Sequence, residues 1–163
     1  MKILLTGATG YIGKRLLPIL VAQGHEVICC VRDKNRFYCP IELRKSVTVV
    51  EVDFLEPETM EAIPTDVEVA YYLIHSMSGE ETNYDELESI SAENFVSRMD
   101  QTKVKQVIYL SGIVNDASLS KHLASRKKVE TILNKWLKEP YGNRRVIGCQ
   151  SELLDAGFDE YAQ

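Results

Sequence analysis

The sequence has no long hydrophobic run, which bears on membranes and secretion. No stretch approaches the roughly 18 consecutive apolar residues of a membrane-spanning helix. The opening residues, Met-Lys-Ile-Leu-Leu-Thr-Gly, turn polar too early for the apolar core of a secretory signal. We therefore expect a cytoplasmic protein that does not contact a membrane.

An excess of positive charge is also missing. The 19 lysines and arginines are scattered, and 24 acidic residues bring the formal net charge to -5. Nucleic acids and anionic membranes are bound through clustered basic residues. We expect neither as a partner, and look instead for a small-molecule ligand or substrate.

Cysteine and histidine are too few and too scattered to indicate a metal site. The four cysteines form no C-x-x-C pair, and no histidine stands near them at metal-ligand spacing. Two of them, Cys29 and Cys30, fall inside an apolar run. We expect reduced, structural thiols and no metal.

What the sequence does contain is a regular alternation of short apolar runs with longer amphipathic segments. Such a pattern predicts repeated βαβ units and a parallel sheet. The expected strands are Lys2–Thr6, Glu26–Val31, Val47–Val52, Val67–Ile74 and Gln106–Leu110, with a short sixth strand at Val146–Ile147. We expect an α/β fold of the Rossmann type, a doubly wound parallel sheet of five or six strands with helices on both faces and a helix after each strand.

Three amphipathic segments predict the main helices. The first begins at Tyr11 and ends at Gly24, and Pro18 should kink it. The others are expected near Asp85–Gln101 and Leu119–Lys138. The residues expected to face the core are Ile12, Leu16, Ile19 and Leu20 in the first, Leu87, Ile90, Phe95 and Met99 in the second, and Val129, Ile132, Leu133 and Trp136 in the third.

A glycine-rich loop joins the first expected strand to the first helix. It reads Thr-Gly-Ala-Thr-Gly-Tyr-Ile-Gly from Thr6 to Gly13. Gly7 permits a tight turn, Gly10 lets phosphates approach the backbone, and Gly13 allows the helix to pack closely on the sheet. Because backbone N–H groups at a helix N-terminus bind a pyrophosphate, the loop predicts a dinucleotide site rather than a turn without a ligand. The expected contacts come from Gly7, Thr9, Gly10, Tyr11, Ile12 and Gly13.

The end of the second strand bears on which dinucleotide is bound. Sites that prefer NAD place an acidic residue there for the ribose 2′-hydroxyl, whereas Val31 fills that position here. Arg32 follows, and Arg36 lies one turn on, so guanidinium groups can meet a 2′-phosphate. We expect NADP(H), with NAD less favoured. Alternatively, Arg32 is only a solvated surface residue, and Asp33 serves NAD or caps the next helix.

The spacing G-x-x-G-x-x-G resembles that of the extended and atypical short-chain dehydrogenase/reductase superfamily. The resemblance covers roughly residues 1–139 and includes Cys-Val-Arg-Asp, Val-Asp-Phe, Tyr-Tyr-Leu-Ile-His-Ser-Met and Tyr-Leu-Ser-Gly after successive strands. Together these motifs look like the nucleoside-diphosphate-sugar epimerase-like or NmrA-like NAD(P)-binding branch. The resemblance implies that Asp53 and Phe54 lie beside the adenine and that Ile74, His75 and Ser76 line the cofactor further along. For Asp53 the alternative is a turn or cap residue.

The same resemblance implies a catalytic arrangement that this chain does not fully match. Members carry a Tyr-x-x-x-Lys pair for proton transfer and a serine that polarises the substrate carbonyl. Ser111 stands at the serine position, but His122 and Arg126 occupy the tyrosine and lysine positions. Histidine still titrates near neutral pH, so His122 and Arg126 remain catalytic candidates beside a plain surface role. Tyr109 points into or across a strand, which makes it a poor acid.

The resemblance also implies a substrate-binding region that is almost absent here. We expect residues 1–139 to form an NAD(P)-binding domain, with residues 140–163 as a short extension, in a naturally minimal or a truncated form. Three possibilities follow: an NADP(H)-dependent reductase or epimerase-like enzyme, a non-catalytic NADP(H)-sensing regulator, and a half-domain with no activity of its own. Because a five-stranded sheet leaves an edge unpaired, we also expect a homo-oligomer.

Overall fold

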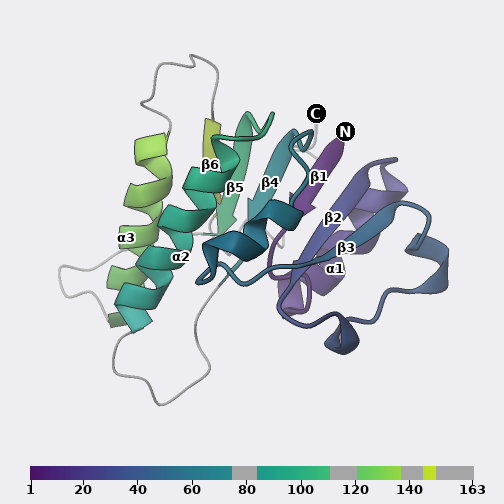
Figure 1. Ribbon diagram of the computed structural model, residues 1–163, viewed down its shortest axis with the longest axis horizontal. Coiled ribbons are helices and arrows are strands. Elements are labelled where there is room, and N and C mark those ends of the chain that lie inside the picture. The colour runs from purple at the N-terminus through teal and green to yellow at the C-terminus, as the bar shows by residue number, and fades with distance from the viewer. Residues whose placement is uncertain (75–83, 111–120, 137–144, 150–163) are drawn as a thin grey trace.

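The computed structural model describes residues 1–74, 84–110, 121–136 and 145–149, and these form one six-stranded parallel sheet. The strands lie in the order β3-β2-β1-β4-β5-β6, so the chain runs outward from the centre in both directions (Figure 1). Their bounds are β1 Lys2–Leu5, β2 Glu26–Val31, β3 Val47–Glu51, β4 Val69–Tyr72, β5 Gln106–Leu110 and β6 Arg145–Cys149. The doubly wound sheet is confirmed, and β6 contains the short sixth strand expected at residues 146–147.

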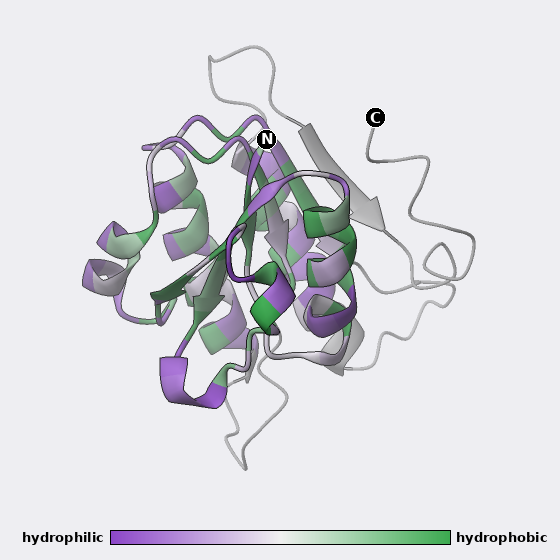
Figure 2. Ribbon diagram, turned by 90° about the vertical axis from the view of Figure 1, so that its right-hand side faces the viewer, coloured by the Kyte–Doolittle hydropathy of each residue, from purple (hydrophilic) through white to green (hydrophobic). Residues whose placement is uncertain are grey.

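Helices cover both faces of this sheet. They are α1 Tyr11–Ala22, α2 Tyr84–Met99 and α3 Lys121–Trp136. One core holds side chains of α2 and α3, including Phe95 and Trp136, while the other holds Leu16, Leu17 and Leu20 of α1. Side chains of successive strand residues alternate between the two cores, as the pleat requires. In Figure 2 the strands of the sheet are mostly hydrophobic, whereas the helices carry both hydrophobic and hydrophilic residues.

The connections around β3 differ from the expectation of a helix after every strand. Three 3-10 turns take the place of two α-helices: η1 Lys34–Arg36 and η2 Ile41–Leu43 before β3, and η3 Pro57–Ala62 after it. Pro40 has no N–H to donate and disfavours helical geometry at the residue before it, which divides the first connection. In the second, Ile63 precedes Pro64 and is extended at φ -76° and ψ 123°, where η3 ends.

Two residues expected in the core lie on the outer face of their helices. Ile19 of α1 is 40% exposed and Ile90 of α2 is 37% exposed. Leu17 takes the inner position in α1, and in α2 the buried stripe that ends in Met99 begins with the polar residue Glu88. Sequence periodicity misassigned Ile90 because polar residues of α2 occupy buried positions, and it misassigned Ile19 because Leu16, Leu17 and Leu20 already fill the inner face of α1. The α1 helix runs through Pro18, which lies on its exposed side.

The edge that was expected to be open after β5 is covered. The β6 strand pairs with β5 along its whole length, from Gln106–Arg145 to Leu110–Cys149. This removes the argument for oligomerisation from that edge, and the homo-oligomer stays a prediction.

The cysteines of β2 are free thiols, and burial raises the pKa of Cys29 to about 12. Within the described ranges, no helix is both long and apolar enough to cross a membrane.

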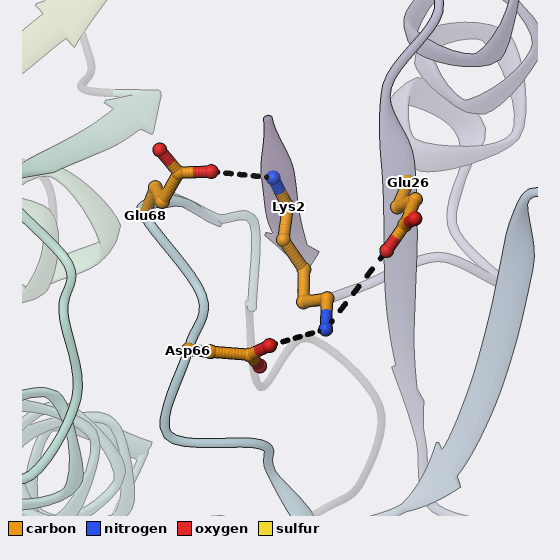
Figure 3. A network of polar contacts seen from close by, with 4 residues as sticks. All are labelled: Lys2, Glu26, Asp66 and Glu68. Carbon is orange, nitrogen blue, oxygen red and sulfur yellow. Dashed lines mark hydrogen bonds and ion pairs between the residues drawn. The ribbon is translucent and has the colours of Figure 1, made fainter.

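At the amino end of the sheet, a lysine joins three elements (Figure 3). The ammonium of Lys2 on β1 donates to Asp66 at 2.5 Å and lies 3.9 Å from the carboxylate of Glu26 on β2. The backbone N–H of Lys2 donates to Glu68 at 3.0 Å. The hydrogen bond between Lys2 and Asp66 raises the pKa of the lysine and lowers that of the carboxyl.

Replacing Lys2 with methionine should lower the melting temperature at pH 7, because the chain loses this contact between β1 and the segment before β4. Since the folded-state pKa of Asp66 is depressed, its contribution is present above pH 3.8 and is lost as the pH falls through the folded value. Thermal melts between pH 2 and 7 should show a shallower acid limb for Lys2→Met than for the wild type. Lys45→Met, which removes an exposed lysine outside this network, should leave that limb unchanged. Equal acid limbs in Lys2→Met and wild type would contradict the assignment.

Candidate functional site

The glycine loop turns the chain sharply from β1 into α1. Gly7 follows β1 by two residues and has φ +63°, a conformation that L-residues with a side chain rarely adopt. The N–H of Gly10 donates to the carbonyl of Gly7 at 2.9 Å, which closes the turn. The helix then begins at Tyr11. The loop therefore lies at the carboxyl end of β1, in the centre of the sheet where the strand order reverses, which is the usual ligand site of such folds.

Two of the three glycines are required by close packing. A Cβ atom on Gly7 would lie 2.5 Å from the carbonyl oxygen of Leu73, which follows β4. A Cβ atom on Gly13 would lie 2.3 Å from the carbonyl oxygen of Gly7. Both distances are below any contact that a real Cβ makes, and both neighbours are backbone. The loop is thus pressed against β4 on one side and α1 on the other.

The third glycine, Gly10, lies on the open side of the loop. It is exposed together with its neighbours Thr9 and Tyr11, whereas Ile12 is half-buried and Gly13 is buried. A Cβ atom on Gly10 would meet only the Gly7 carbonyl, at 3.2 Å. A ligand can therefore approach the backbone here without meeting a side chain.

The N-terminus of α1 is suited to an anion. Gly10 is its N-cap and supplies no side-chain hydrogen bond, and the first turn contains no acidic residue. The first N–H groups of a helix have no partner within the helix, and the helix dipole makes this end positive. The cradle formed by an open glycine at an uncapped helix N-terminus fits the pyrophosphate of a dinucleotide.

Thr6 supports the loop from below, a role the sequence analysis missed. Its side chain is fully buried, and its hydroxyl donates to the carbonyl of Tyr71 at 3.0 Å and accepts from the N–H of Leu73 at 2.9 Å. These bonds extend the pairing of β1 and β4 beyond the strands themselves. The sequence did contain a sign of this role, because Thr6 is a single polar residue between an apolar strand and the glycine loop.

The cationic residues after β2 are free to meet a ligand. Arg32 directly follows the strand and Arg36 ends η1, and both are exposed. The carboxylate of Asp33 accepts from the N–H of Asn35 at 2.9 Å and so caps η1. The cap that was expected as one alternative role of Asp33 is therefore present.

Asp53 and Phe54 form the turn after β3. The carboxylate of Asp53 accepts from the N–H of Leu55 at 3.0 Å, so the expected alternative of a turn residue also describes it. The ring of Phe54 is buried against Phe95, with centroids 5.9 Å apart, and therefore packs in the core. The side chain of Ile74, after β4, is partly buried against the same core. His75, Ser76 and Ser111 lie outside the described residues.

The expected catalytic helix is held in place by buried polar contacts. His122 and Arg126 lie in α3 one turn apart. The hydroxyl of Tyr109 on β5 donates to the backbone carbonyl of Arg126 at 3.3 Å, and Ser125 donates to the carboxylate of Glu88 on α2. Burial raises the pKa of the Tyr109 phenol well above its usual range, which agrees with its exclusion as a proton donor.

Comparison with known proteins also indicates a dinucleotide-binding fold. Residues 7–146 match the sequence profile of a family described as NAD(P)H-binding, whereas no curated protein matches the chain. The UDP-glucose 4-epimerase of Thermotoga maritima is similar in structure, with 20% identity and a TM-score of 0.71 over 90% of this chain and 53% of that one.

Two further similar structures were determined with a nicotinamide cofactor. Gre2 from Candida albicans, in complex with NADPH, has 14% identity and a TM-score of 0.70 over 90% of this chain and 56% of that one. The UDP-glucuronic acid 4-epimerase of Bacillus cereus, in complex with NAD, has 18% identity and a TM-score of 0.68 over 92% and 56%. At these identities the likeness is one of fold, and the chain spans about half the length of the three proteins. The expected Rossmann-type fold is confirmed.

Proposed function

Because the chain belongs to the NAD(P)H-binding family, we propose that it binds NADP(H) in preference to NAD(H) at the glycine loop. The observation that carries this proposal is the geometry of that loop. Gly7 and Gly13 leave no room for a side chain, whereas Gly10 opens onto the uncapped N-terminus of α1. The pyrophosphate of the dinucleotide binds there, and the adenosine half extends toward the ends of β2 and β3.

The preference for NADP(H) rests on the residues after β2. One oxygen of the Asp33 carboxylate accepts the N–H of Asn35, which directs this side chain toward the backbone of η1. Arg32 and Arg36 are exposed on the same segment and supply positive charge for a 2′-phosphate. Similar folds were solved with NADPH and with NAD, so the choice depends on these side chains.

Calorimetric titration of NADPH and NADH tests the preference directly. Wild-type protein should bind NADPH more tightly, and Arg32→Ala should weaken NADPH by about tenfold while NADH changes by less than about twofold, because a charge-assisted hydrogen bond to the 2′-phosphate is lost. Arg44→Ala removes an equal charge from the same connection and should leave both affinities unchanged. A wild-type preference for NADH would overturn the proposal.

We further propose that the cofactor serves a reductase or epimerase-like reaction. When bound, the nicotinamide ring accepts or donates a hydride. In this scheme Ser111 polarises a substrate carbonyl, His122 exchanges the proton, and Arg126 holds a ribose or phosphate group. The hydrogen bond from the Tyr109 hydroxyl to the Arg126 carbonyl supports this, because it ties α3 to the carboxyl end of β5.

A non-catalytic role as an NADP(H)-sensing regulator is the second candidate. It is favoured by the His122-to-Arg126 segment, where histidine and arginine stand in place of the expected tyrosine and lysine. Oxidation of bound NADPH by carbonyl compounds, followed by absorbance, separates the two. Turnover that His122→Ala abolishes supports the enzyme, whereas tight NADPH binding without turnover of any carbonyl supports the regulator.

A further inference from the structure

The α1 helix carries an unusual pair of side chains beside the glycine loop. The guanidinium carbon of Arg15 lies 3.6 Å from the centroid of the Tyr11 ring, and its Nη1 donates to the carbonyl of Tyr11 at 3.3 Å. Both residues are exposed, Tyr11 at 72%. The stack therefore holds a cation in a defined position on the surface of the first turn of α1.

That position is unfavourable for a cation unless an anion is nearby. Side chains on a helix lean toward its N-terminus, so Arg15 reaches back over Tyr11, the first residue of α1, rather than toward the C-terminus. The helix dipole is positive at this end, and the first turn contains no acidic residue. Lys14 adds a second positive charge, and within the described part of the chain neither it nor Arg15 has a carboxylate at ion-pair distance.

We infer that Arg15 is a cofactor-binding residue that contacts the pyrophosphate, pre-positioned by its stack on Tyr11. The inference rests on the proposed function. A guanidinium has five N–H donors, and the bond from Nη1 to the Tyr11 carbonyl uses one of them on a side chain that is exposed. The stack limits the rotamers of Arg15 in the free protein, so little side-chain entropy is lost when the anion binds.

The location separates this role from that of Arg32. Arg15 lies on α1 beside the loop at the centre of the sheet, whereas Arg32 follows β2, the next strand outward. A pyrophosphate is common to NADPH, NADH and ADP-ribose, while only NADPH has the 2′-phosphate. The two arginines therefore predict different patterns across the same three ligands.

Calorimetry on the full chain with these three ligands tests the inference. Arg15→Ala should weaken all three by a similar factor of about three to ten, because each loses one charge-assisted contact. Arg15→Lys should recover part of the loss, since it retains the charge without the planar stack. Tyr11→Leu should cause part of the same loss of affinity, because Arg15 is then no longer held by the stack. Lys14→Ala, a matched loss of charge in the same turn, should change each affinity by less than about twofold.

The outcomes distinguish this inference from the proposed function. If wild-type protein binds NADPH while Arg15→Ala binds all three ligands within about twofold of wild type, Arg15 makes no contact and only the inference fails. A loss confined to NADPH would also overturn it, because Arg15 would then read the 2′-phosphate. If wild-type protein binds none of the ligands, the proposed function fails and the inference falls with it. Melting temperatures of all variants should match the wild type, since these side chains are exposed.

Discussion

Replacing Gly13 with alanine should abolish dinucleotide binding and lower the free energy of unfolding by about 3 kcal/mol, which is typical of a severe overpacking change. The new Cβ would lie 2.3 Å from the carbonyl oxygen of Gly7 and 2.8 Å from the α-carbon of Ala8. Both are backbone atoms that cannot rotate away, so α1 must move off the loop. Urea denaturation measures the first effect, and titration with NADPH measures the second.

Gly24→Ala is the matched control for this prediction. Gly24 follows the other end of α1 with φ +82°, and no atom lies within 4 Å of the Cβ that alanine would add. The cost is that of a left-handed backbone alone, about 1–2 kcal/mol. Gly24→Ala should therefore be destabilised yet bind NADPH like the wild type. Wild-type binding by Gly13→Ala would show that the close contact between α1 and the loop is not needed for the site.

Thr6→Val should cost about 1–3 kcal/mol of stability, because it leaves the partly buried N–H of Leu73 without its acceptor. Valine has nearly the shape of threonine, so the core is not emptied. It cannot accept from the N–H of Leu73 or donate to the carbonyl of Tyr71. Since the carbonyl of Leu73 abuts Gly7, a shift there should also weaken NADPH binding. Denaturant unfolding and calorimetry measure the two effects.

Two variants make the prediction for Thr6 decisive. Thr6→Ser retains the hydroxyl and should recover most of the loss. Thr131→Val makes the same chemical change at an exposed position of α3, where the hydroxyl donates to the Lys127 carbonyl at 2.9 Å, and should be nearly neutral. If Thr6→Val and Thr131→Val are equally stable, the hydroxyl of Thr6 does not join β1 to β4.

Much of the sheet could be predicted because buried parallel strands have a plain sequence signal. The bounds expected for Glu26–Val31 and Gln106–Leu110 are those observed for β2 and β5. A strand buried on both faces reads as a continuous apolar run, and little else has that pattern over so few residues. The helices α1, α2 and α3 could also be predicted from the sequence, because their apolar residues recur at helical spacing.

The inner faces of the helices were harder to assign. Glu88 and Ser125 are polar, yet both are buried, because each supplies the hydrogen bond that the other needs between α2 and α3. A periodicity argument places such residues outside and moves Ile90 inward in compensation. The 3-10 turns on either side of β3 were not predicted. Pro40 and Pro64 disfavour a helix there, but we expected a helix after every strand.

The sequence by itself determined the parallel sheet, the glycine loop at the carboxyl end of its first strand, and arginines in place of an acidic residue after the second. Each depends on neighbours in the chain, where periodicity and backbone preference operate. The tertiary structure alone decided that Gly7 abuts Leu73, that Thr6 binds the same segment, and that Asp33 is used as a cap. Contacts between β1 and β4 join residues more than sixty positions apart, and only the packed sheet brings their backbone atoms together.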